Sequence, residues 1–207
     1  MIEVRCTIEF LKWMGGLQDG RAKRAIAARI DRLATGNPGD VKPVGRGVSE
    51  LRIRYGPGYR IYYVQRGTVL IVLLCGGDKS SQDADIAKAH VIAEDLEDWQ
   101  MALKTLPYDS AEYVEDDQAI AEYLEEAMKI AMEDSDPSFL AQALGTVARA
   151  RGMSQIAKEA GLSRESLYKA LGAEGNPEFG TILRVIQALG LRLSIASSAS
   201  GSAASGS

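Results

Sequence analysis

The sequence predicts an α+β fold for the first hundred residues, in the order β-α-α-β-β-β-α, and an all-α fold for the residues after them. Up to about residue 98, runs rich in β-branched and aromatic residues alternate with segments of helical periodicity. From Met101 onward, apolar residues recur only at helical spacing. The composition is that of a folded protein, with 207 residues of which 46% are hydrophobic and 25% charged. This length suffices for one large domain or two small ones.

The first half mixes strands and helices. Residues 2–7 alternate apolar and polar side chains, which predicts a half-buried strand. Apolar residues at helical spacing among arginines and lysines predict a basic amphipathic helix over 21–33, ended by the Gly-Asn-Pro-Gly sequence that follows. Next come three strand-like runs joined by glycine-containing connections, typical of an antiparallel meander, and a last helix. These segments are residues 50–55, 60–66, 68–75 and 81–99.

The second half contains only helical signals. Residues 116–132 place apolar side chains on one face and glutamates on the other. The Asp-Ser-Asp-Pro turn after this helix supplies a cap, Ser135 or Asp136, and a proline for the first position of the next helix, expected over 140–151. Ser154 is expected to cap the helix after that.

The net charge of −4 conceals three blocks of opposite sign. Residues 1–79 carry a net charge of +7, residues 80–140 carry −14, and residues 141–207 carry +3. Basic blocks of this kind favour anionic partners. The arrangement therefore suggests two parts that face nucleic acid, separated by an acidic segment that could neutralise one of them.

The cysteine count and hydropathy exclude several classes of protein. Cys6 and Cys75, with a single histidine, can form neither a disulfide framework nor a usual zinc site, so we expect reduced, buried cysteines, no metal and no cofactor. The longest apolar run, 69–75, is too short to cross a bilayer. The first residues contain no apolar leader, so we expect a cytoplasmic protein without a membrane partner.

Residues 154–171 contain the most specific motif. Ala157 suits a close crossing of two helices, Gly161 suits a left-handed turn, Ser163 can cap a second helix, and Leu167 anchors the inner face of that helix. This spacing predicts a helix-turn-helix, whose second helix enters the major groove of DNA. The residues left on the outside are Ser163, Arg164, Glu165, Ser166, Tyr168 and Lys169.

These outward residues suit contacts with DNA. An arginine such as Arg164 can bind guanine, whereas Ser163, Tyr168 and Lys169 suit phosphate. The alternative interpretation is a helical hairpin that packs on another surface and touches no DNA. Because one such unit contacts few base pairs, we expect a homodimer, formed through the second half, on a palindromic operator.

The second half also resembles a known family. Residues 101–195 are similar to HigA-type addiction-module antidote proteins, and the resemblance covers nearly the whole segment. The matching stretches are residues 120–127, 136–137, 148–157, 162–171, 175–177, 181–183 and 188–191. The resemblance implies a DNA-binding repressor of its own operon that also blocks a partner toxin.

The predicted sheet of the first half is dense in cations. On the run 50–55, Arg52 and Arg54 share one face, and on the next strand Arg60 shares a face with Tyr62. A sheet face with arginine and tyrosine is consistent with an RNA surface, because arginine neutralises phosphate and tyrosine stacks on bases. The alternative is a solvated face of a stable sheet. Asp78 is the one carboxylate that the sequence places near these cations.

Residues 1–98 resemble the HigB-like branch of the RelE/ParE toxin superfamily. The matching stretches are residues 36–45, 48–53, 56–63, 73–80 and 85–89. The resemblance implies a ribosome-associated mRNA endonuclease without a metal, in which the RNA 2′-hydroxyl attacks the neighbouring phosphate. The candidate catalytic residues are Arg52, Arg54 and Arg60 as phosphate clamp, Lys79 after the last strand, and Tyr63 to stack on a base. Many relatives have a second basic residue where this chain has Ser80.

The two resemblances divide the chain into four segments. We expect a toxin domain over 1–100, an acidic neutralising region over 101–137, a helix-turn-helix domain over 138–195, and a flexible Ser/Ala/Gly tail over 196–207. Met101 at the junction resembles the start methionine of a separate protein, and a natural fusion, an engineered fusion and two joined chains would all give this sequence.

The acidic region is the candidate inhibitor. Its carboxylates, from Asp109 to Glu126, are expected to cover the basic sheet or the last helix of the first half, with Ile120, Tyr123 and Leu124 as apolar anchors. The alternative is that these acids form only the solvated face of an amphipathic helix.

Two classes of function follow. The first is a toxin–antitoxin module, in which an endonuclease that acts on mRNA at the ribosome is neutralised by a fused antitoxin that also binds operator DNA. The second is a non-catalytic DNA-binding regulator whose toxin-like half serves dimerisation or corepression, which the departure at Ser80 favours. A ParE-like toxin directed at gyrase is a further alternative, because fold does not fix target.

Overall fold

The computed structural model describes residues 2–96 and 104–195. Met101, near which we expect the junction of the two halves, lies outside the described residues, as do the tail 196–207 and the end of the helix predicted over 81–99. Within the described ranges, no helix is long and apolar enough to span a membrane.

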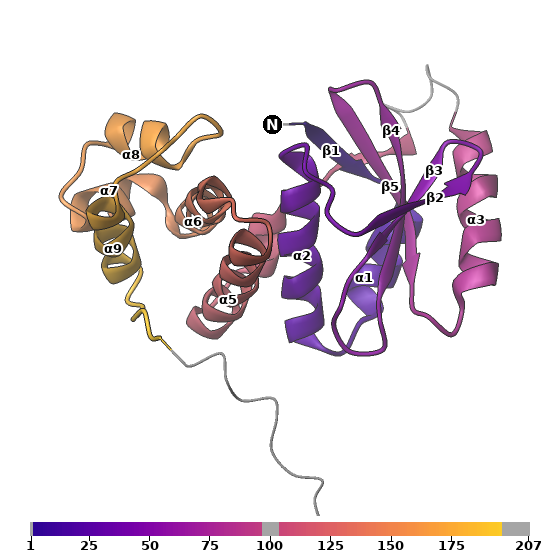
Figure 1. Cartoon of the computed structure of the whole chain (residues 1–207), viewed down its shortest axis with the longest axis horizontal. Helices are drawn as coiled ribbons and strands as arrows, with labels where there is room; N and C mark the ends of the chain where they lie inside the picture. Colours follow the sequence, from indigo (N-terminus) through magenta and orange to yellow (C-terminus); the bar gives the residue numbers. More distant parts are fainter. Residues whose placement is uncertain (1, 97–103, 196–207) are drawn as a thin grey trace, which may run out of the picture.

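The first half is a mixed sheet with helices on both faces (Figure 1). Its strands are β1 (Glu3–Cys6), β2 (Val41–Gly45), β3 (Val48–Arg52), β4 (Arg60–Arg66) and β5 (Leu70–Gly77), and its helices are α1 (Ile8–Gly16), α2 (Gly20–Ala34) and α3 (Gln82–Asp95). The strand order is β2-β3-β4-β5-β1-β6, where β6 (Leu106–Pro107) comes from the second half. Strand β1 runs parallel to β5, and the other pairs are antiparallel.

Two caps and two apolar clusters fix this arrangement. Thr7 caps α1 by accepting from the Phe10 amide at 3.2 Å, and Asp19 caps α2 in the same way. Apolar residues of α1 and α2 form one core with one face of the sheet, including Phe10 and Ile30. The opposite face packs against α3. The predicted helix over 21–33 is confirmed as α2, and Cys6 and Cys75 are free and buried in strands, as expected.

The strand prediction was incomplete in this half. The sequence predicts three strands after α2, but the structure has four, because Val41–Gly45 forms the edge strand. This strand contains Pro43, which only an edge tolerates, and its mostly exposed side chains give no alternating apolar signal. The strand predicted over 50–55 lies instead at Val48–Arg52, and the strand predicted over 68–75 lies at Leu70–Gly77.

The second half is not purely helical, contrary to the sequence prediction. It begins with β6, which pairs with β1, and a 3-10 turn, η1 (Ser110–Tyr113). Arg5 of β1 donates to both the hydroxyl and the carbonyl of Thr105 at 2.7 Å. A two-residue strand has no periodicity of its own, so its position depends on the edge that β1 offers.

Helices form the rest of the second half (Figure 1). They are α5 (Asp117–Glu133), α6 (Pro137–Arg151), α7 (Met153–Glu159), α8 (Arg164–Leu171) and α9 (Phe179–Ala188). The predicted cap of α6 is confirmed: Asp136 accepts from the Ser138 amide at 3.0 Å, with Pro137 in the first position. The predicted cap of the next helix is wrong. Gly152, with a φ of 97°, precedes α7, so Ser154 lies inside its first turn.

Candidate functional site

Strand pairing gathers charged side chains on the face of the sheet that α3 partly covers. In the antiparallel pair of β3 and β4, Glu50 lies opposite Tyr62, and Arg52 lies opposite Arg60. Residues two apart on a strand share a face, and directly paired residues share it too, so these four side chains project to the same side. Gln82, in the first turn of α3, completes a group that we name the Glu50 cluster.

Glu50 is the centre of this cluster and is fully buried. Its Oε1 accepts from Arg52 Nε at 2.7 Å, and its Oε2 accepts from Gln82 at 2.8 Å and from the Tyr62 hydroxyl at 3.4 Å. Arg60 Nε lies 3.5 Å from Oε2. A buried carboxylate is costly unless it is paired and hydrogen-bonded. Two guanidinium groups and two neutral donors meet that requirement here.

The cluster presents cations to solvent at a fixed place. The side chain of Arg52 is 35% exposed and that of Arg60 is 12% exposed. The hydrogen bond to Glu50 raises the pKa of Arg52, which keeps it charged. Burial and the Glu50 charge raise the pKa of Tyr62 well above its usual value, so its phenol remains protonated. The outer guanidinium edges can therefore donate to an anion such as a phosphate.

Sequence reasoning missed Glu50. Two signals could have identified it. Glu50 alternates with apolar residues in a predicted strand, on the face that also carries Arg52. Its burial depends on β4 and α3, however, which contribute Tyr62 and Gln82 from other parts of the chain. No local pattern shows that those donors converge on one carboxylate.

The other predicted catalytic residues, Lys79, Arg54 and Tyr63, differ in their position relative to the Glu50 cluster. Lys79 is exposed in the turn after β5, and it flanks Gly58, whose carbonyl accepts from Arg60 at 2.7 Å. Asp78, beside it, accepts from both the amide and the hydroxyl of Ser80, which hold its pKa below the usual range. This turn therefore lies next to the Glu50 cluster and offers one unburied lysine.

Arg54 borders the Glu50 cluster through Asp40, which also lies 3.8 Å from Arg52, whereas Tyr63 points to the other face of the sheet. Arg54 is 75% exposed and pairs with Asp40 at 3.1 Å. Tyr63 is only 3% exposed and belongs to the core between the sheet and the helices α1 and α2. Its ring cannot stack on a base without opening that core, so the predicted stacking role does not fit its position. The physical reason is the alternation of β4, which turns Tyr62 toward α3 and Tyr63 away from it.

A second set of contacts joins the two halves of the chain. Helix α5 lies against α2, and η1 and α6 pack beside it (Figure 1). Ala27 and Ala28 of α2 share one buried cluster with Ile120 and Tyr123 of α5 and with Val114. Small side chains on α2 let the helices approach closely. Ile120 and Tyr123, two of the three predicted anchors, are fully buried in this contact.

The third predicted anchor lies on another face of α5. Leu124 is partly buried among residues of the second half, and it lines an apolar groove with Met128, Leu144, Ile186 and Leu191. Its side chain therefore packs within the second half. The period of the helix explains the difference, because Tyr123 and Leu124 point about 100° apart around α5.

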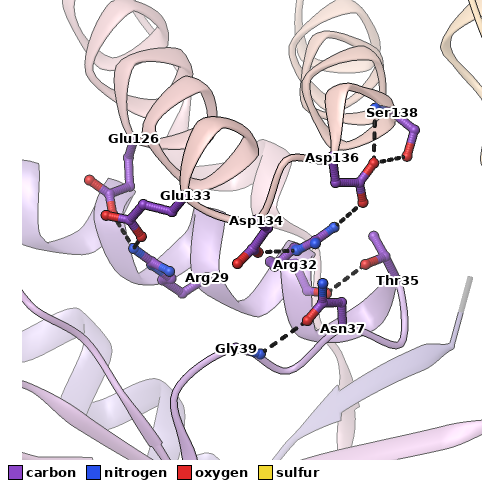
Figure 2. A network of polar contacts seen from close by, with 10 residues as sticks. All are labelled: Arg29, Arg32, Thr35, Asn37, Gly39, Glu126, Glu133, Asp134, Asp136 and Ser138. Carbon is purple, nitrogen blue, oxygen red and sulfur yellow. Dashed lines mark hydrogen bonds and ion pairs between the residues drawn. The ribbon is translucent and has the colours of Figure 1, made fainter.

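Arginines of α2 and acids of the second half form a row that we name the ion-pair ladder. Its pairs are Arg21–Glu125 at 2.8 Å, Arg24–Glu122 at 2.5 Å, Arg29–Glu126 at 3.3 Å, Arg29–Glu133 at 3.0 Å, Arg32–Asp134 at 2.9 Å and Arg32–Asp136 at 2.5 Å. Figure 2 shows the end of the ladder at Arg29 and Arg32. Arg32 is only 2% exposed, and its guanidinium also lies over the ring of Phe139, 5.3 Å from the centroid.

The acidic segment therefore packs on α2, not over the sheet or the last helix of the first half as the sequence led us to expect. The reason is the amphipathic pattern of α2, which offers an alanine surface bordered by arginines. Within this segment, β6 extends the sheet at β1, and the end of α5 approaches the arginines of β3. There Glu133 and Asp134 line one cleft with Arg52 and Arg54.

A third group of predicted residues lies around α8. The turn between α7 and α8 contains Gly161 with a φ of 67°, and the Ser163 side chain accepts from the Ser166 amide at 3.0 Å. Ala157 and Leu167 are buried, as the motif predicts. The six predicted DNA contacts are all exposed, namely Ser163, Arg164, Glu165, Ser166, Tyr168 and Lys169. The guanidinium of Arg164 lies 5.4 Å from the ring centroid of Tyr168.

Comparison with known proteins assigns the two halves to two families. Residues 12–97 match the family described as phage derived protein Gp49-like, and residues 104–197 match the family described as probable addiction module antidote protein. The chain is a toxin–antitoxin type fusion. The Glu50 cluster and α2 lie in the Gp49-like segment, and α5 to α9 lie in the antidote segment, so the ion-pair ladder joins the two.

Two relatives of this fusion come from Haemophilus influenzae (strain Rd), and both are described as uncharacterized proteins. The first is 50% identical over 95 residues, which cover 46% of this chain and 96% of the relative. The second is 43% identical over 88 residues, which cover 42% of this chain and 87% of the relative. No solved structure matches the chain significantly. In the part of the fusion that the structure describes, no three His, Cys, Asp or Glu side chains form a group suited to a metal ion.

Proposed function

We propose that the chain is a toxin–antitoxin module of the HigB/HigA kind, in which the first half is a latent ribosome-associated mRNA endonuclease. The second half neutralises it and binds operator DNA as an autorepressor. The observation that carries the catalytic part is the Glu50 cluster, which holds two arginines where β3 ends and β4 begins. The Gp49-like and antidote matches support the pairing of a toxin with its inhibitor.

The chemistry requires a clamp for the phosphate, a proton acceptor for the 2′-hydroxyl and a proton donor for the leaving oxygen. When the 2′-hydroxyl of RNA gives up its proton and its oxygen attacks the adjacent phosphorus, the bond from phosphorus to the 5′-oxygen of the next nucleotide breaks. That oxygen takes up a proton, and negative charge develops on the phosphate oxygens during the step. Arg52 and Arg60 can stabilise that charge, because the hydrogen bond of Arg52 to Glu50 and that of Arg60 to the Gly58 carbonyl orient both guanidinium groups before the substrate arrives. Lys79, in the adjacent turn, adds an exposed ammonium group. In this proposal Glu50 is a positioning residue, since its oxygens are occupied by donors.

Neutralisation would act without filling the Glu50 cluster. The second half covers α2 through the ion-pair ladder. In the cleft at the end of α5, Glu133 and Asp134 line the same space as Arg52. Two effects would then keep RNA away. The bulk of the second half prevents docking on a large partner such as the ribosome, and the acids repel the phosphate backbone near Arg52.

The operator-binding role rests on the exposed face of α8. A helix that begins after a left-handed glycine and a serine cap, with arginine and lysine outward, has the form of a recognition helix. The acidic α5 faces the first half instead of this surface. Operator binding and neutralisation would therefore use different faces of the second half.

Expression of residues 1–100 from a tight inducible promoter tests the catalytic proposal. We expect growth arrest with mRNA cleavage, relieved when residues 104–195 are supplied from a second plasmid. The substitutions E50Q and R60Q should each abolish the arrest. R46Q is the matched control. Arg46 is exposed, and among the described residues its ion pair is with Glu94.

The alternatives give different outcomes in the same experiment. A soluble, folded first half without toxicity would contradict the proposal and support the non-catalytic regulator, for which Ser80 in place of a basic residue is the favouring observation. Arrest with intact mRNA and altered DNA supercoiling would support a gyrase-directed toxin. Arrest that persists in E50Q would show that the Glu50 cluster is not the site.

A further inference from the structure

One acid interrupts the basic helix α2. Among the charged residues of α2, Asp31 is the only carboxylate, and it lies beside Arg32 and two positions after Arg29. Both arginines belong to the ion-pair ladder, so the acid sits in the middle of the face that the second half covers. A carboxylate at that place weakens the attraction of α2 for acids, and it would not be expected if the helix served only as a cationic surface.

The second half supplies the groups that bind this carboxylate. The Ser110 hydroxyl donates to Asp31 Oδ1 at 2.5 Å, the Tyr123 hydroxyl donates to Oδ2, and the Thr146 hydroxyl donates to Oδ2 at 3.3 Å. These donors come from η1, α5 and α6, and Tyr123 is fully buried. Three separate elements thus converge on one side chain of the first half.

We propose that Asp31 is the specificity-determining residue of α2, which makes this basic helix a docking surface for a protein partner with convergent hydroxyl donors. The inference rests on the proposed role of the second half as the partner of the first. The partner that it fits is an acidic helix flanked by serine, tyrosine and threonine hydroxyls, as in residues 104–151 of this chain.

The observations favour a protein over a nucleic acid at this surface. Any polyanion could pair with the arginines of the ladder, including the backbone of RNA. Phosphate oxygens are acceptors only, however, so a phosphate backbone laid along the arginines would place negative charge beside Asp31. Ala27 and Ala28 add a flat apolar area that a helix fills and a phosphate backbone does not.

A double-mutant cycle in the full chain tests the proposal. Hydrogen exchange of the α2 and α5 amides reports how often the contact opens. We expect Y123F to increase that exchange about tenfold, because a buried carboxylate loses a donor. In a D31N background the same change should increase it less than about threefold, since no charge is left unsatisfied. E125Q is the control, because its pair with Arg21 is exposed and should be neutral in both backgrounds.

Several results would overturn the proposal. If Y123F has the same effect in both backgrounds, Asp31 does not set the choice of partner. If Y123F fails to fold alone, the cycle is run with T146V, and restoration of soluble Y123F by D31N becomes the expected result.

A single-stranded RNA of 20 nucleotides, added to the Y123F chain, should leave exchange unchanged. Protection of α2 with faster exchange in α5 would instead identify α2 as a nucleic-acid surface. Exchange does not depend on toxicity, so this cycle and the growth assay fail independently.

Discussion

Two acids of the first half, Glu50 and Asp31, hold opposite kinds of partner. Glu50 is satisfied mainly by two cations of its own half, and those cations then face outward. Asp31 is satisfied by neutral hydroxyls of the other half. A carboxylate paired with charge gains Coulombic energy, whereas one bound only by hydroxyls depends on the geometry of each donor. Glu50 therefore positions arginines of its own half, whereas Asp31 contributes to recognition of the second half.

The pKa of Asp31 predicts a pH dependence of stability. Burial raises this pKa above its usual value, while the hydroxyls and the charge of Arg149 lower it in part. Because the folded chain holds the proton more tightly, the stabilisation from Asp31 is complete below its unfolded pKa, about 4, and is lost as the pH rises through the folded value. The buried phenols of Tyr108 and Tyr123 remain neutral throughout, since burial raises their pKa well above 10.

Urea denaturation of the full chain and of D31N between about pH 2.5 and pH 8 measures this effect. The free energy of unfolding of the parent chain, relative to that of D31N, should fall as the pH rises. D136N provides an internal contrast, because Ser138 and Arg32 hold the pKa of Asp136 below its usual value. The stabilisation from Asp136 should be present above its unfolded pKa and fall as the pH drops. Parallel profiles for the two variants would contradict the assignment.

At the residue scale, sequence predicted exposed groups better than buried ones. Arg164 and Lys169 are exposed beside a buried Leu167, as helical periodicity requires. Glu50 was missed, and Tyr63 was given a role that its burial does not fit. In both cases the environment of the side chain depends on strand pairing and on a helix distant in sequence, which a local pattern does not contain.

At the scale of elements, α2 connects the core of the first half with the core of the interface between the halves. One face packs on the sheet through Ile26, Ile30 and Leu33, and the other meets α5 through Ala27 and Ala28. The ladder borders the second face. Its members differ in burial, since Arg32 is 2% exposed and Arg21 is 51% exposed. Their contributions to stability should differ accordingly.

We expect R32A to destabilise the full chain by about 3 kcal/mol, because it leaves Asp134 and Asp136 without their buried partner. R21A should cost less than about 1 kcal/mol, as is usual for an exposed ion pair. Chemical denaturation of both variants measures the difference. Equal losses would mean that the ladder acts through its overall charge, and then high salt should destabilise the parent chain by the same amount as R32A does.

Elements with local periodicity were predicted well, and elements defined by pairing were not. The helices α2, α5 and α6 each carry an apolar stripe and a cap within their own sequence. Strands β2 and β6 are short, lie at the two edges of the sheet and contain a proline each. Both segments become strands because they pair with a neighbouring strand, β2 with β3 and β6 with β1. Their own sequences contain no alternating apolar pattern that predicts a strand.

On the scale of the whole molecule, the charge blocks are matched in space. The acidic block that begins at residue 80 supplies the ladder for α2, so much of the positive charge of the first half is neutralised within the chain. The exposed cations around α8 are not used in this way: Arg164 and Lys169 stand on a face remote from α5. A molecule of net charge −4 can therefore attract DNA only through a local basic surface.

The salt dependence of DNA binding tests that local surface without knowledge of the operator. For a random 30-base-pair duplex, the affinity of the full chain should fall with salt concentration, and K169Q should reduce the slope of log K against log salt by about 0.9 if Lys169 contacts one phosphate. K129Q, on α5, is the matched control and should leave the slope unchanged, because Lys129 lies near Glu126 on the acidic helix. R164A should weaken specific binding more than random binding once an operator is found. An equal slope for K169Q and K129Q would show that DNA does not bind at α8, and the helix-turn-helix interpretation of residues 154–171 would then give way to a hairpin that packs on another protein.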